Sequence, residues 1–243
     1  MGVNRPTKKA ALITGGAQRI GQGITFKLSS LGYKIALHYN RSKNEAQRTA
    51  AEIKHRGGTC QLFQCDLEDG NATQQLIERV QKSFPNLNLL INNASIFEPS
   101  GLTKESIQHL NRHFAINFFA PYILTCSFAA LCKKGHIINI LDTNIVKNKT
   151  AHTTYLLSKK SLYELTKLAA VSLAPHIRVN AIAPGLIFPP EGKGGWYLQQ
   201  RAKSIPLKRK GSLPAITQAV QFLIENDYLT GQTIFVAGGE HLL

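Results

Sequence analysis

Asp142, Tyr155 and Lys159 are three side chains whose types and spacing could support proton transfer. Tyr155 and Lys159 are four positions apart, so they share one face if residues 153–173 form a helix. A neighbouring ammonium group favours a phenolate, and Lys159 is therefore expected to lower the pKa of Tyr155 from its usual value of roughly 10. The phenol would then donate and accept a proton closer to neutral pH.

Asp142 joins this pair only if a strand places it there. It directly follows the apolar run 136–141 and lies thirteen positions before Tyr155. The run predicts a buried strand, and open α/β sheets bind their ligands beyond the carboxyl ends of the strands. A tyrosine and a lysine at this spacing also occur on helices by chance, so the elements around them decide the interpretation.

Apolar runs alternate with helical patterns along the whole chain. This alternation predicts an α/β fold with a single Rossmann-type, doubly wound parallel sheet of about seven strands and helices on both faces. No linker or internal repeat divides the sequence, so residues 1–243 are expected to form one domain. The expected strands are residues 10–14, 33–39, 59–65, 88–91, 136–141, 177–183 and 233–236, and long helices are expected within residues 71–84, 106–133, 153–173 and 215–224.

Three local signals refine these expectations. Residues 184–210 are rich in proline and glycine, which predicts a long substrate loop with little regular structure. Pro121 is expected to bend or break the helix within residues 106–133. Ser42 and Glu45 have the spacing of a capping box at the start of a helix.

The composition limits the classes of function. A net charge of +15 suits nucleic acid, an acidic carrier or a phosphate-bearing ligand, but the basic residues are scattered and read mostly as a solvated surface. The four cysteines form no CxxC pair, so neither a metal site nor a disulfide framework is indicated. Residues 1–9 lack the apolar core of a signal peptide, and the apolar segment 123–132 is too short to span a bilayer. A cytoplasmic protein without a membrane or nucleic-acid partner is expected.

A glycine-rich turn, residues 14–21, follows the first expected strand and precedes a helix. Backbone N–H groups and the positive end of a helix bind the pyrophosphate of a dinucleotide at such a place. Glycine is also common in purely structural turns, so the turn is a weak signal by itself.

Together with this turn, several motifs resemble the short-chain dehydrogenase/reductase family in order and spacing. The resemblance covers essentially the full chain and implies the fold described above. Its motifs are TGxxx(G)xG at 14–21, Asn92-Asn93-Ala94, Asn117, YxxSK at 155–159 and Pro184-Gly185.

Departures from the family pattern are also informative. Arg19 replaces the middle glycine of the turn, and Asp142 stands where the family has its catalytic serine. Residues 93–95 end in serine where glycine is more common, and Phe97 follows closely. With the segment 38–42, this combination is similar to the pteridine reductase subgroup. The resemblance implies a pterin or folate substrate and a homotetramer built through the long helix and the Tyr155 helix.

The second strand indicates which cofactor binds. An NAD site places an acid near the end of this strand, whereas the first acid here is Glu45, already within the next helix. Arg41 and Ser42 occupy the place instead, with Arg19 across the turn, and arginines neutralise a 2′-phosphate. NADP(H) is therefore expected, although Arg41 could also be a solvated loop residue. The residues expected to contact it are Gly15, Arg19, Ile20, Gly21, Tyr39, Asn40, Arg41, Ser42, Asp66, Leu67, Asn93, Ala94, Ser95, Lys159, Pro184 and Gly185.

Asp142 changes the chemistry expected of the site. A carboxylate only accepts hydrogen bonds and would repel the negative charge that grows on a carbonyl oxygen, but it suits a substrate with N–H donors or a ring nitrogen to be protonated. A pterin has both. The hypothesis is that hydride from NADPH goes to a ring carbon while Tyr155, backed by Asp142, protonates the adjacent nitrogen. The residues expected to contact the substrate are Arg19, Ser95, Phe97, Asp142 and Tyr155.

The remaining roles follow from the resemblance. Lys159 would bind the nicotinamide ribose, Asn117 would hold a relay water, and Phe97 would stack on the pterin. Each has a plainer interpretation: Phe97 as a core aromatic, Asn117 as a helix contact, and Asp66, expected at the adenine, as a turn cap.

Two other functions stay open at this point. A reductase of the same family acting on a carbonyl or acyl-carrier substrate would explain the charge through an acidic carrier, but Asp142 argues against it. A non-catalytic nucleic-acid or regulatory binder on the same fold would leave the Tyr155 and Lys159 pair unexplained. The choice among biopterin, monapterin and folate depends on residues 184–210.

Overall fold

Seven apolar runs of the sequence form one parallel sheet with the order β3-β2-β1-β4-β5-β6-β7. Because the central strands are covered by helices on both faces, they are mostly apolar without a solvent-facing polar side, and the polar residues His136 and Asn139 of β5 are buried as well. The predicted doubly wound α/β fold is confirmed. The strands are β1 (Ala10–Ile13), β2 (Lys34–Tyr39), β3 (Cys60–Gln64), β4 (Leu87–Asn92), β5 (Gly135–Ile140), β6 (Ile177–Pro184) and β7 (Thr233–Val236).

The computed structural model describes residues 9–103, 106–190 and 192–243. The segment 1–8, in which no signal peptide is expected, and residue 191 of the substrate loop lie outside the described residues.

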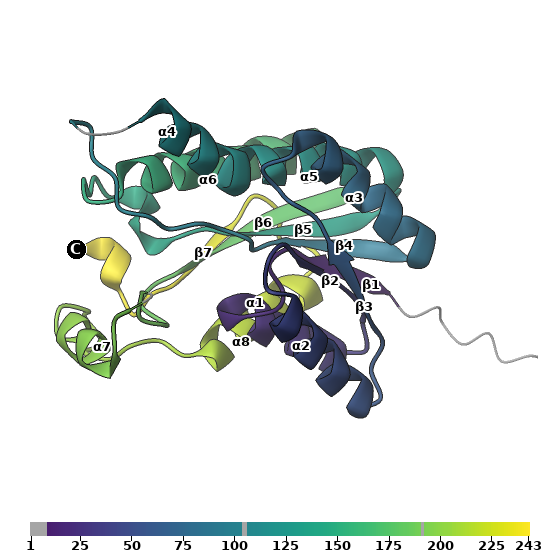
Figure 1. The fold of residues 1–243 in the computed structure, drawn as a ribbon, viewed down its shortest axis with the longest axis horizontal. Helices are drawn as coiled ribbons and strands as arrows, with labels where there is room; N and C mark the ends of the chain where they lie inside the picture. The colour runs from purple at the N-terminus through teal and green to yellow at the C-terminus, as the bar shows by residue number, and fades with distance from the viewer. Residues whose placement is uncertain (1–8, 104–105, 191) are drawn as a thin grey trace, which may run out of the picture.

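Helices cover the two faces of the sheet (Figure 1). Because the strands are parallel, each strand is joined to the next one in the chain by a crossover that contains a helix. Strands and helices therefore alternate in the sequence. On one face lie α1 (Arg19–Ser30), α2 (Lys43–His55) and α8 (Leu213–Glu225); on the other lie α3 (Gly70–Ser83), α4 (Ile107–Phe114), α5 (Ala120–Leu131) and α6 (Thr153–Ser172).

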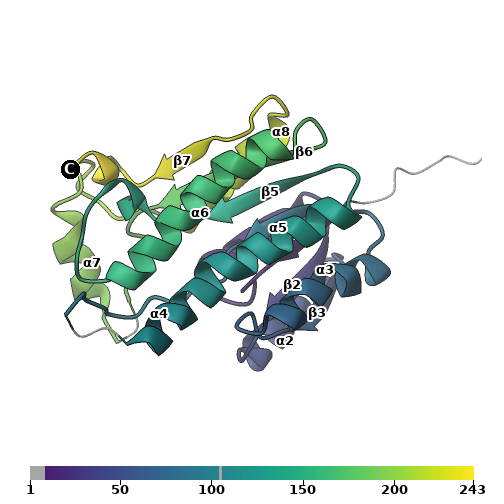
Figure 2. The ribbon, with the colours of Figure 1, turned by 90° about the horizontal axis from the view of Figure 1, so that it is seen from above.

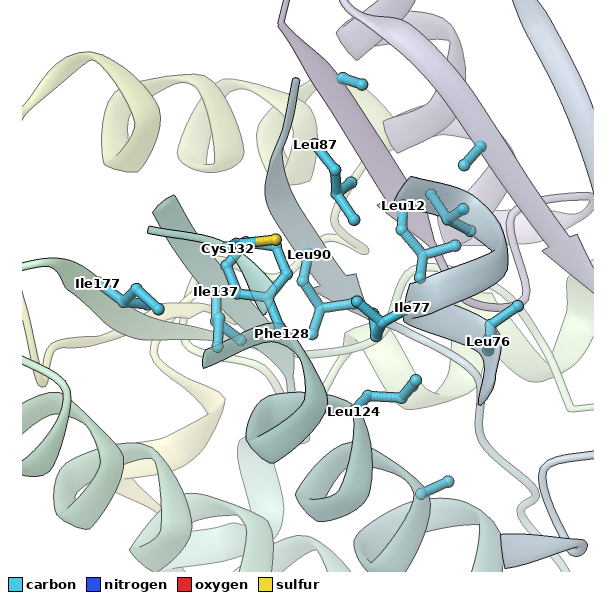
Figure 3. Packing of buried hydrophobic residues seen from close by; sticks show 14 of the residues in the cluster. Leu12, Leu76, Ile77, Leu87, Leu90, Leu124, Phe128, Cys132, Ile137 and Ile177 are labelled. Atoms are coloured by element: carbon cyan, nitrogen blue, oxygen red, sulfur yellow. The ribbon is translucent and has the colours of Figure 1, made fainter. Parts of the chain in front are cut away.

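The core beneath α3 and α5 holds the central strands in place (Figure 3). Phe128 and Leu124 of α5 pack with Leu90 of β4 and Ile137 of β5, and all four are fully buried. Burying a leucine, isoleucine or phenylalanine side chain contributes about 1.5–3 kcal/mol each. This packing fixes the register of β4 and β5, and so the position of Asp142 just beyond β5.

The long helix around Pro121 bends without breaking. The π-helical turn η1 (Ala115–Phe119) joins α4 to α5, and Pro121 lies in the first turn of α5. A wider turn before proline accommodates the missing N–H without ending the helix. The helix Ile107–Leu131 is thus 25 residues long and meets the length and composition of a membrane span, contrary to the expectation from the segment 123–132. It packs along α6 on the sheet (Figure 2), and 33% of its 18-residue apolar window is buried.

The segment after β6 is more regular than its proline and glycine content suggests. It contains α7 (Gly195–Ala202), whereas a loop with little regular structure was expected. Ala202 and Ile205 are buried and hold α7 against the rest of the molecule. Figures 1 and 2 both place α7 close to the C-terminal turn η3 (Glu240–Leu242), so two late segments of the chain close one end of the sheet.

Candidate active site

A cleft of about 870 Å³ lies beyond the carboxyl ends of the strands. Its size is at the upper end of the range for small-molecule sites and suits a large cofactor together with a substrate. Every residue predicted to contact cofactor or substrate lines it, and of the predicted catalytic residues only Asn117 does not. The alternating fold therefore gathers residues from the ends of six strands, β1 to β6, into one site.

Tyr155 and Asp142 are joined directly in this cleft. The Tyr155 hydroxyl donates a hydrogen bond of 2.9 Å to Oδ2 of Asp142. The other carboxylate oxygen, Oδ1, accepts from the backbone N–H and the side-chain amide of Asn144, both at 2.7 Å. Asp142 is thus the N-cap of the short turn η2 (Thr143–Val146) and a partner of the phenol at once. Asn144, which the sequence did not single out, fixes the carboxylate.

The expected effect of Lys159 on Tyr155 is wrong. Burial, and then the Asp142 carboxylate, raise the pKa of Tyr155 well above its usual value. The Lys159 ammonium lies 6.0 Å from the centre of the Tyr155 ring and donates to the carbonyl of Ile140 at 2.8 Å. Burial in turn lowers the pKa of Lys159 to about 8. Tyr155 is therefore held as a neutral phenol in the free enzyme: its proton is present for transfer, but the raised pKa makes it a weaker acid than an ordinary tyrosine.

The glycine-rich turn is shaped for close approach. A Cβ on Gly21 would lie 2.2 Å from the carbonyl oxygen of Gly15, and Gly15 has a φ of 60°. His38, which was not predicted to have a role, holds this turn: its Nδ1 accepts from the N–H of Gly15, and its Nε2 lies 3.1 Å from the carbonyl oxygen of Cys65. Burial lowers the pKa of His38 to about 4, so the ring is neutral and can accept the Gly15 N–H.

Arg19 has a backbone conformation that glycine adopts more readily than other residues. Its φ is 51°, a left-handed conformation that costs a side-chain-bearing residue free energy. The guanidinium donates to the carbonyl of Pro189 at 2.9 Å and lies 5.2 Å from the centre of the Phe188 ring. Arg19 thus ties the turn to the segment after β6 across the cleft.

The end of β2 carries no acid. Arg41 and Ser42 line the cleft where β2 passes into α2. Ser42 is the N-cap of α2, but its hydroxyl makes no capping hydrogen bond, so the predicted capping box does not form. The hydroxyl and the positive end of α2 remain for an anion beside Arg41. Asp66, at the end of β3, lines the cleft and also accepts from the N–H of Glu68, so it serves the turn as well.

Phe97 lies beside Tyr155 and His152. Its ring stacks on His152 at 4.0 Å between centroids and meets Tyr155 edge-on at 4.7 Å. Phe97 is 47% exposed, which excludes the interpretation as a core aromatic. A flat ring system bound in the cleft would find an aromatic surface here.

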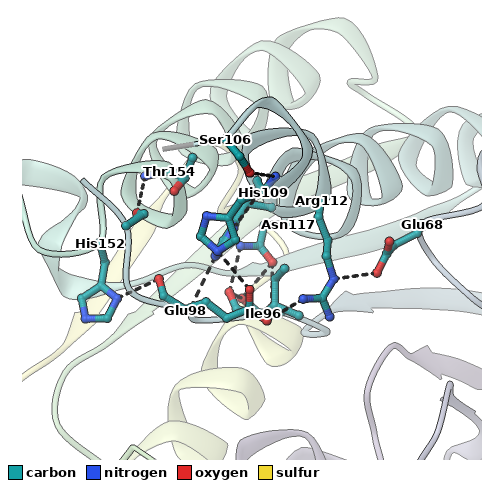
Figure 4. Close-up of polar contacts among 12 residues, drawn as sticks. Glu68, Ile96, Glu98, Ser106, His109, Arg112, Asn117, His152 and Thr154 are labelled. Carbon is teal, nitrogen blue, oxygen red and sulfur yellow. Dashed lines mark hydrogen bonds and ion pairs between the residues drawn. The ribbon is translucent and has the colours of Figure 1, made fainter. Parts of the chain in front are cut away.

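A polar network holds the Phe97 segment in place (Figure 4). The Glu98 carboxylate accepts from Arg112 at 2.6 Å and lies 3.0 Å from Nε2 of His109. The backbone carbonyl of Glu98 is hydrogen-bonded to Nδ1 of His152, and Arg112 also donates a hydrogen bond to the Glu68 carboxylate. The partners are far apart in sequence, and no motif signals them. The donor atoms of Glu98, His109 and His113 lie within 4.8 Å of one another, but a cation there would compete with Arg112 for Glu98.

Asn117 lies in η1 and is fully buried. Its side-chain oxygen accepts from the Ser95 hydroxyl and the Ile96 N–H, and its amide donates to the Ile96 carbonyl and the Ser158 hydroxyl. These contacts use both donors and both acceptor positions of the amide. The structure therefore gives the relay-water prediction no support and makes Asn117 the support of the Ser95 segment.

Comparison with known proteins adds to this geometry. The profile of the short chain dehydrogenase family matches residues 9–192. The chain belongs to this family. The family expected from the motifs is thereby confirmed, and the protein is an oxidoreductase by descent.

Curated relatives in the family carry reductase names. A 3-oxoacyl-[acyl-carrier-protein] reductase FabG of Staphylococcus epidermidis is 31% identical over 242 residues, which cover 96% of this chain and 99% of the relative. A 3-oxoacyl-[acyl-carrier-protein] reductase of Synechocystis sp. is 28% identical over 240 residues, with coverage of 96% and 97%.

Solved structures are similar over the whole chain. FolM alternative dihydrofolate reductase 1 from Brucella suis, in complex with NADP, has a TM-score of 0.93 and 34% identity and covers 98% of this chain and 97% of its own. The FolM protein of the same description from Brucella canis, complexed with NADP, has the same TM-score and identity and covers 98% and 95%.

Proposed function

We propose that this protein is an NADPH-dependent reductase of pterins and dihydropterins, dihydrofolate included. The observation that carries the proposal is the Asp142 carboxylate bonded to the Tyr155 hydroxyl beside the exposed ring of Phe97. The likeness to two dihydrofolate reductases complexed with NADP supports it.

The residues of the cleft fit NADP(H). Gly15 and Gly21 let the turn pack tightly on itself and on Asn93, and the turn leads into the start of α1, where backbone N–H groups would bind a pyrophosphate. Arg41 and the uncommitted Ser42 hydroxyl suit a 2′-phosphate, which an acid in their place would repel. Lys159, which lines the cleft and donates to the Ile140 carbonyl, would bind the nicotinamide ribose.

The chemistry divides between cofactor and side chains. When bound, NADPH supplies the hydride for a ring carbon of the substrate. Tyr155 gives its proton to the adjacent ring nitrogen, so the substrate gains one hydride and one proton in all. Because Asp142 disfavours the phenolate, Tyr155 regains a proton from solvent, and the carboxylate next to it is the route.

The same carboxylate selects the substrate. Two acceptor positions of Asp142 Oδ1 are taken by Asn144 and one position of Oδ2 by Tyr155. A further acceptor position on Oδ2 is left for an N–H group of a pterin. A ketone offers no such donor, and its oxygen would gain negative charge beside the carboxylate. Phe97 adds a stacking surface for the flat heterocycle.

An assay of NADPH oxidation tests the proposal. The purified protein is given dihydrobiopterin, dihydrofolate and an acetoacetyl thioester in parallel, with NADH as the alternative cofactor. Turnover of at least one dihydropterin with NADPH, well above that of the thioester, is expected. Turnover of the thioester alone would contradict the proposal.

A second function deserves the same assay. The curated relatives at 31% and 28% identity are named 3-oxoacyl-[acyl-carrier-protein] reductases, so a carbonyl substrate on an acyl carrier is the competing candidate. It would require the carbonyl oxygen to be held without the family's serine, because Asp142 stands in that place. Rapid reduction of an acetoacetyl acyl-carrier protein would favour it.

The assembly and location belong to the proposal too. Phe119 and Tyr122 on the long helix, and Leu168 and Val171 on α6, are apolar and between 49% and 82% exposed. Partner copies would cover such faces in a homotetramer built through these helices. Light scattering after gel filtration measures the assembly.

We place the protein in the cytoplasm, consistent with free cysteines at positions 60, 65, 126 and 132.

A further inference from the structure

Three cations gather at one end of the cleft. Lys149, from the segment that leads into α6, and Arg201, from α7, line the cleft wall. Lys147 lies behind them, and its ammonium donates to the backbone carbonyl of Glu240. Two segments more than fifty positions apart in the chain therefore bring basic side chains to the same place.

Two carboxylates, Glu240 and Asp142, act on the charge of Lys147, and Glu240 is the one that Arg201 contacts. Arg201 approaches Oε1 of Glu240 at 3.4 Å, and the Glu240 side chain is only 10% exposed. Lys147 bonds the backbone of Glu240, so the carboxylate is left to Arg201. Burial first, and then the positive charge of Lys149, lower the pKa of Lys147, which shows that these cations repel one another. In the described part of this end, the positive charge exceeds the negative.

The cluster lies at the substrate end of the cleft. A Cβ on Gly185 would lie 3.1 Å from Oε2 of Glu240, so Glu240 adjoins the Pro184-Gly185 turn expected at the nicotinamide. Tyr197 of α7 and His152, which stacks on Phe97, line the same region. Figures 1 and 2 both show α7 well apart from α2, whose first turn carries the proposed 2′-phosphate site. The proposed 2′-phosphate site therefore does not use these cations.

We propose that Lys149 and Arg201 bind the anionic tail of the substrate, so that the preferred substrate is a dihydropterin conjugated to carboxylates, as in the p-aminobenzoylglutamate tail of dihydrofolate. This rests on the proposed pterin chemistry and adds the choice among its substrates. A pterin with a short uncharged side chain would leave both cations without a ligand.

The chemistry of the two side chains suits this role. Arginine offers a planar pair of N–H donors that matches a carboxylate, and lysine adds a mobile point charge. Lys149 is exposed and can follow a flexible tail, whereas Arg201 is oriented by Glu240. Further glutamates on the tail would add carboxylates within the screening distance of these cations.

Kinetics with charge-removing variants test the assignment. Lys149→Gln and Arg201→Gln are compared with wild type on dihydrofolate, dihydrofolate diglutamate and dihydrobiopterin. Each variant should raise KM for dihydrofolate by about threefold to tenfold, and more for the diglutamate, while dihydrobiopterin changes less than about twofold. Lys133→Gln is the matched control, since Lys133 is exposed before the amino end of β5, opposite the strand ends that form the cleft.

The tail alone gives a second readout. With NADPH at saturation, p-aminobenzoylglutamate should inhibit reduction by the wild type competitively with dihydrofolate and should inhibit Lys149→Gln more weakly. Normal turnover of dihydrobiopterin shows that a variant is folded.

The remaining outcomes are distinct. Equal losses on dihydrofolate and dihydrobiopterin, or no loss on either, would overturn the tail assignment and leave the pterin reductase standing. If the two variants lose activity selectively on an acetoacetyl acyl-carrier protein, the tail assignment would be overturned in favour of binding to an acidic carrier. If the wild type reduces none of the dihydropterins, the proposed function itself fails.

Discussion

The Tyr155 hydroxyl donates to Oδ2 of Asp142 at 2.9 Å, although the two residues come from different elements, the N-terminal turn of α6 and the loop after β5. The bond works against the phenolate, because the carboxylate and burial both raise the pKa of Tyr155. A site that needed Tyr155 as a base would not be built in this way. The pair keeps Tyr155 protonated in the free enzyme, so that its proton is present when hydride transfer makes the substrate nitrogen basic.

Arg41 should decide between the two nicotinamide cofactors. Arg41→Asp replaces a cation beside the expected 2′-phosphate with an acid, so kcat/KM for NADPH should fall by about tenfold to a hundredfold. The value for NADH should change by less than about threefold, since NADH carries no 2′-phosphate. Arg48→Asp makes the same charge change on an exposed position of α2 outside the cleft and is the control. Equal losses with both cofactors would count against the assignment.

Lys159 should set the alkaline limit of activity. Burial lowers its pKa to about 8, so the free enzyme loses this positive charge as the pH rises through about 8. The charge attracts the anionic cofactor, and kcat/KM for NADPH, which reports the free enzyme, should fall above that pH. Measurement from about pH 6 to 9.5 checks this. A profile that stays flat across the range would contradict it.

His38 should make the fold sensitive to acid. Its pKa is about 6.5 in an unfolded chain and is lowered to about 4 by burial, so the unfolded state binds more protons between these values. The contribution of His38 to the free energy of unfolding should therefore be greatest above pH 6.5. Titration of this group alone should lower the free energy of unfolding by about 3 kcal/mol when the pH falls to 4. Urea denaturation at several pH values measures it.

His38→Gln should flatten that dependence, because glutamine does not titrate. His55→Gln is the control, since His55 is exposed at the end of α2. His136, whose pKa burial lowers to about 3, adds to the slope in both proteins. An unchanged slope in His38→Gln would show that the ring is not buried in the neutral form.

Glu98 should matter for the substrate more than for the cofactor. Glu98→Gln keeps the size of the side chain but weakens its contacts with Arg112 and His109, which hold the Phe97 segment. KM for dihydropterins should rise about threefold to tenfold, and KM for NADPH should stay within about twofold. Glu78→Gln, which breaks an exposed pair with Lys82, should change neither. A matching rise in both KM values for Glu98→Gln would instead indicate a general loss of structure.

The sequence predicts the fold and the membership of the site well, for a physical reason. Buried parallel strands and their covering helices leave strong apolar patterns, and a spacing of four on one helix is enough to place Tyr155 and Lys159 together. The glycine turn and Asp142 follow from their positions at strand ends. All of these signals are local.

The errors concern interactions that depend on distant residues or on burial. Lys159 does not lower the pKa of Tyr155, because its ammonium donates to the Ile140 carbonyl and Asp142 is the charge nearer to the phenol. Ser42 has the sequence pattern of a capping residue, but its hydroxyl, which lies at the cleft, makes no capping hydrogen bond. The contacts of Glu98 with partners on α4 join positions that no local pattern relates. Helix α7 forms despite the surrounding prolines because it packs through Ala202.

The central claim is that Asp142 directs hydride to a nitrogen heterocycle and away from a ketone. The most direct measurement is the ratio of kcat/KM for dihydrobiopterin to kcat/KM for an acetoacetyl thioester, in wild type and in Asp142→Ser. The account predicts that this ratio falls by about a hundredfold or more in the variant, through loss of pterin turnover and gain of carbonyl turnover. A variant that keeps its pterin turnover and gains no carbonyl activity would contradict it.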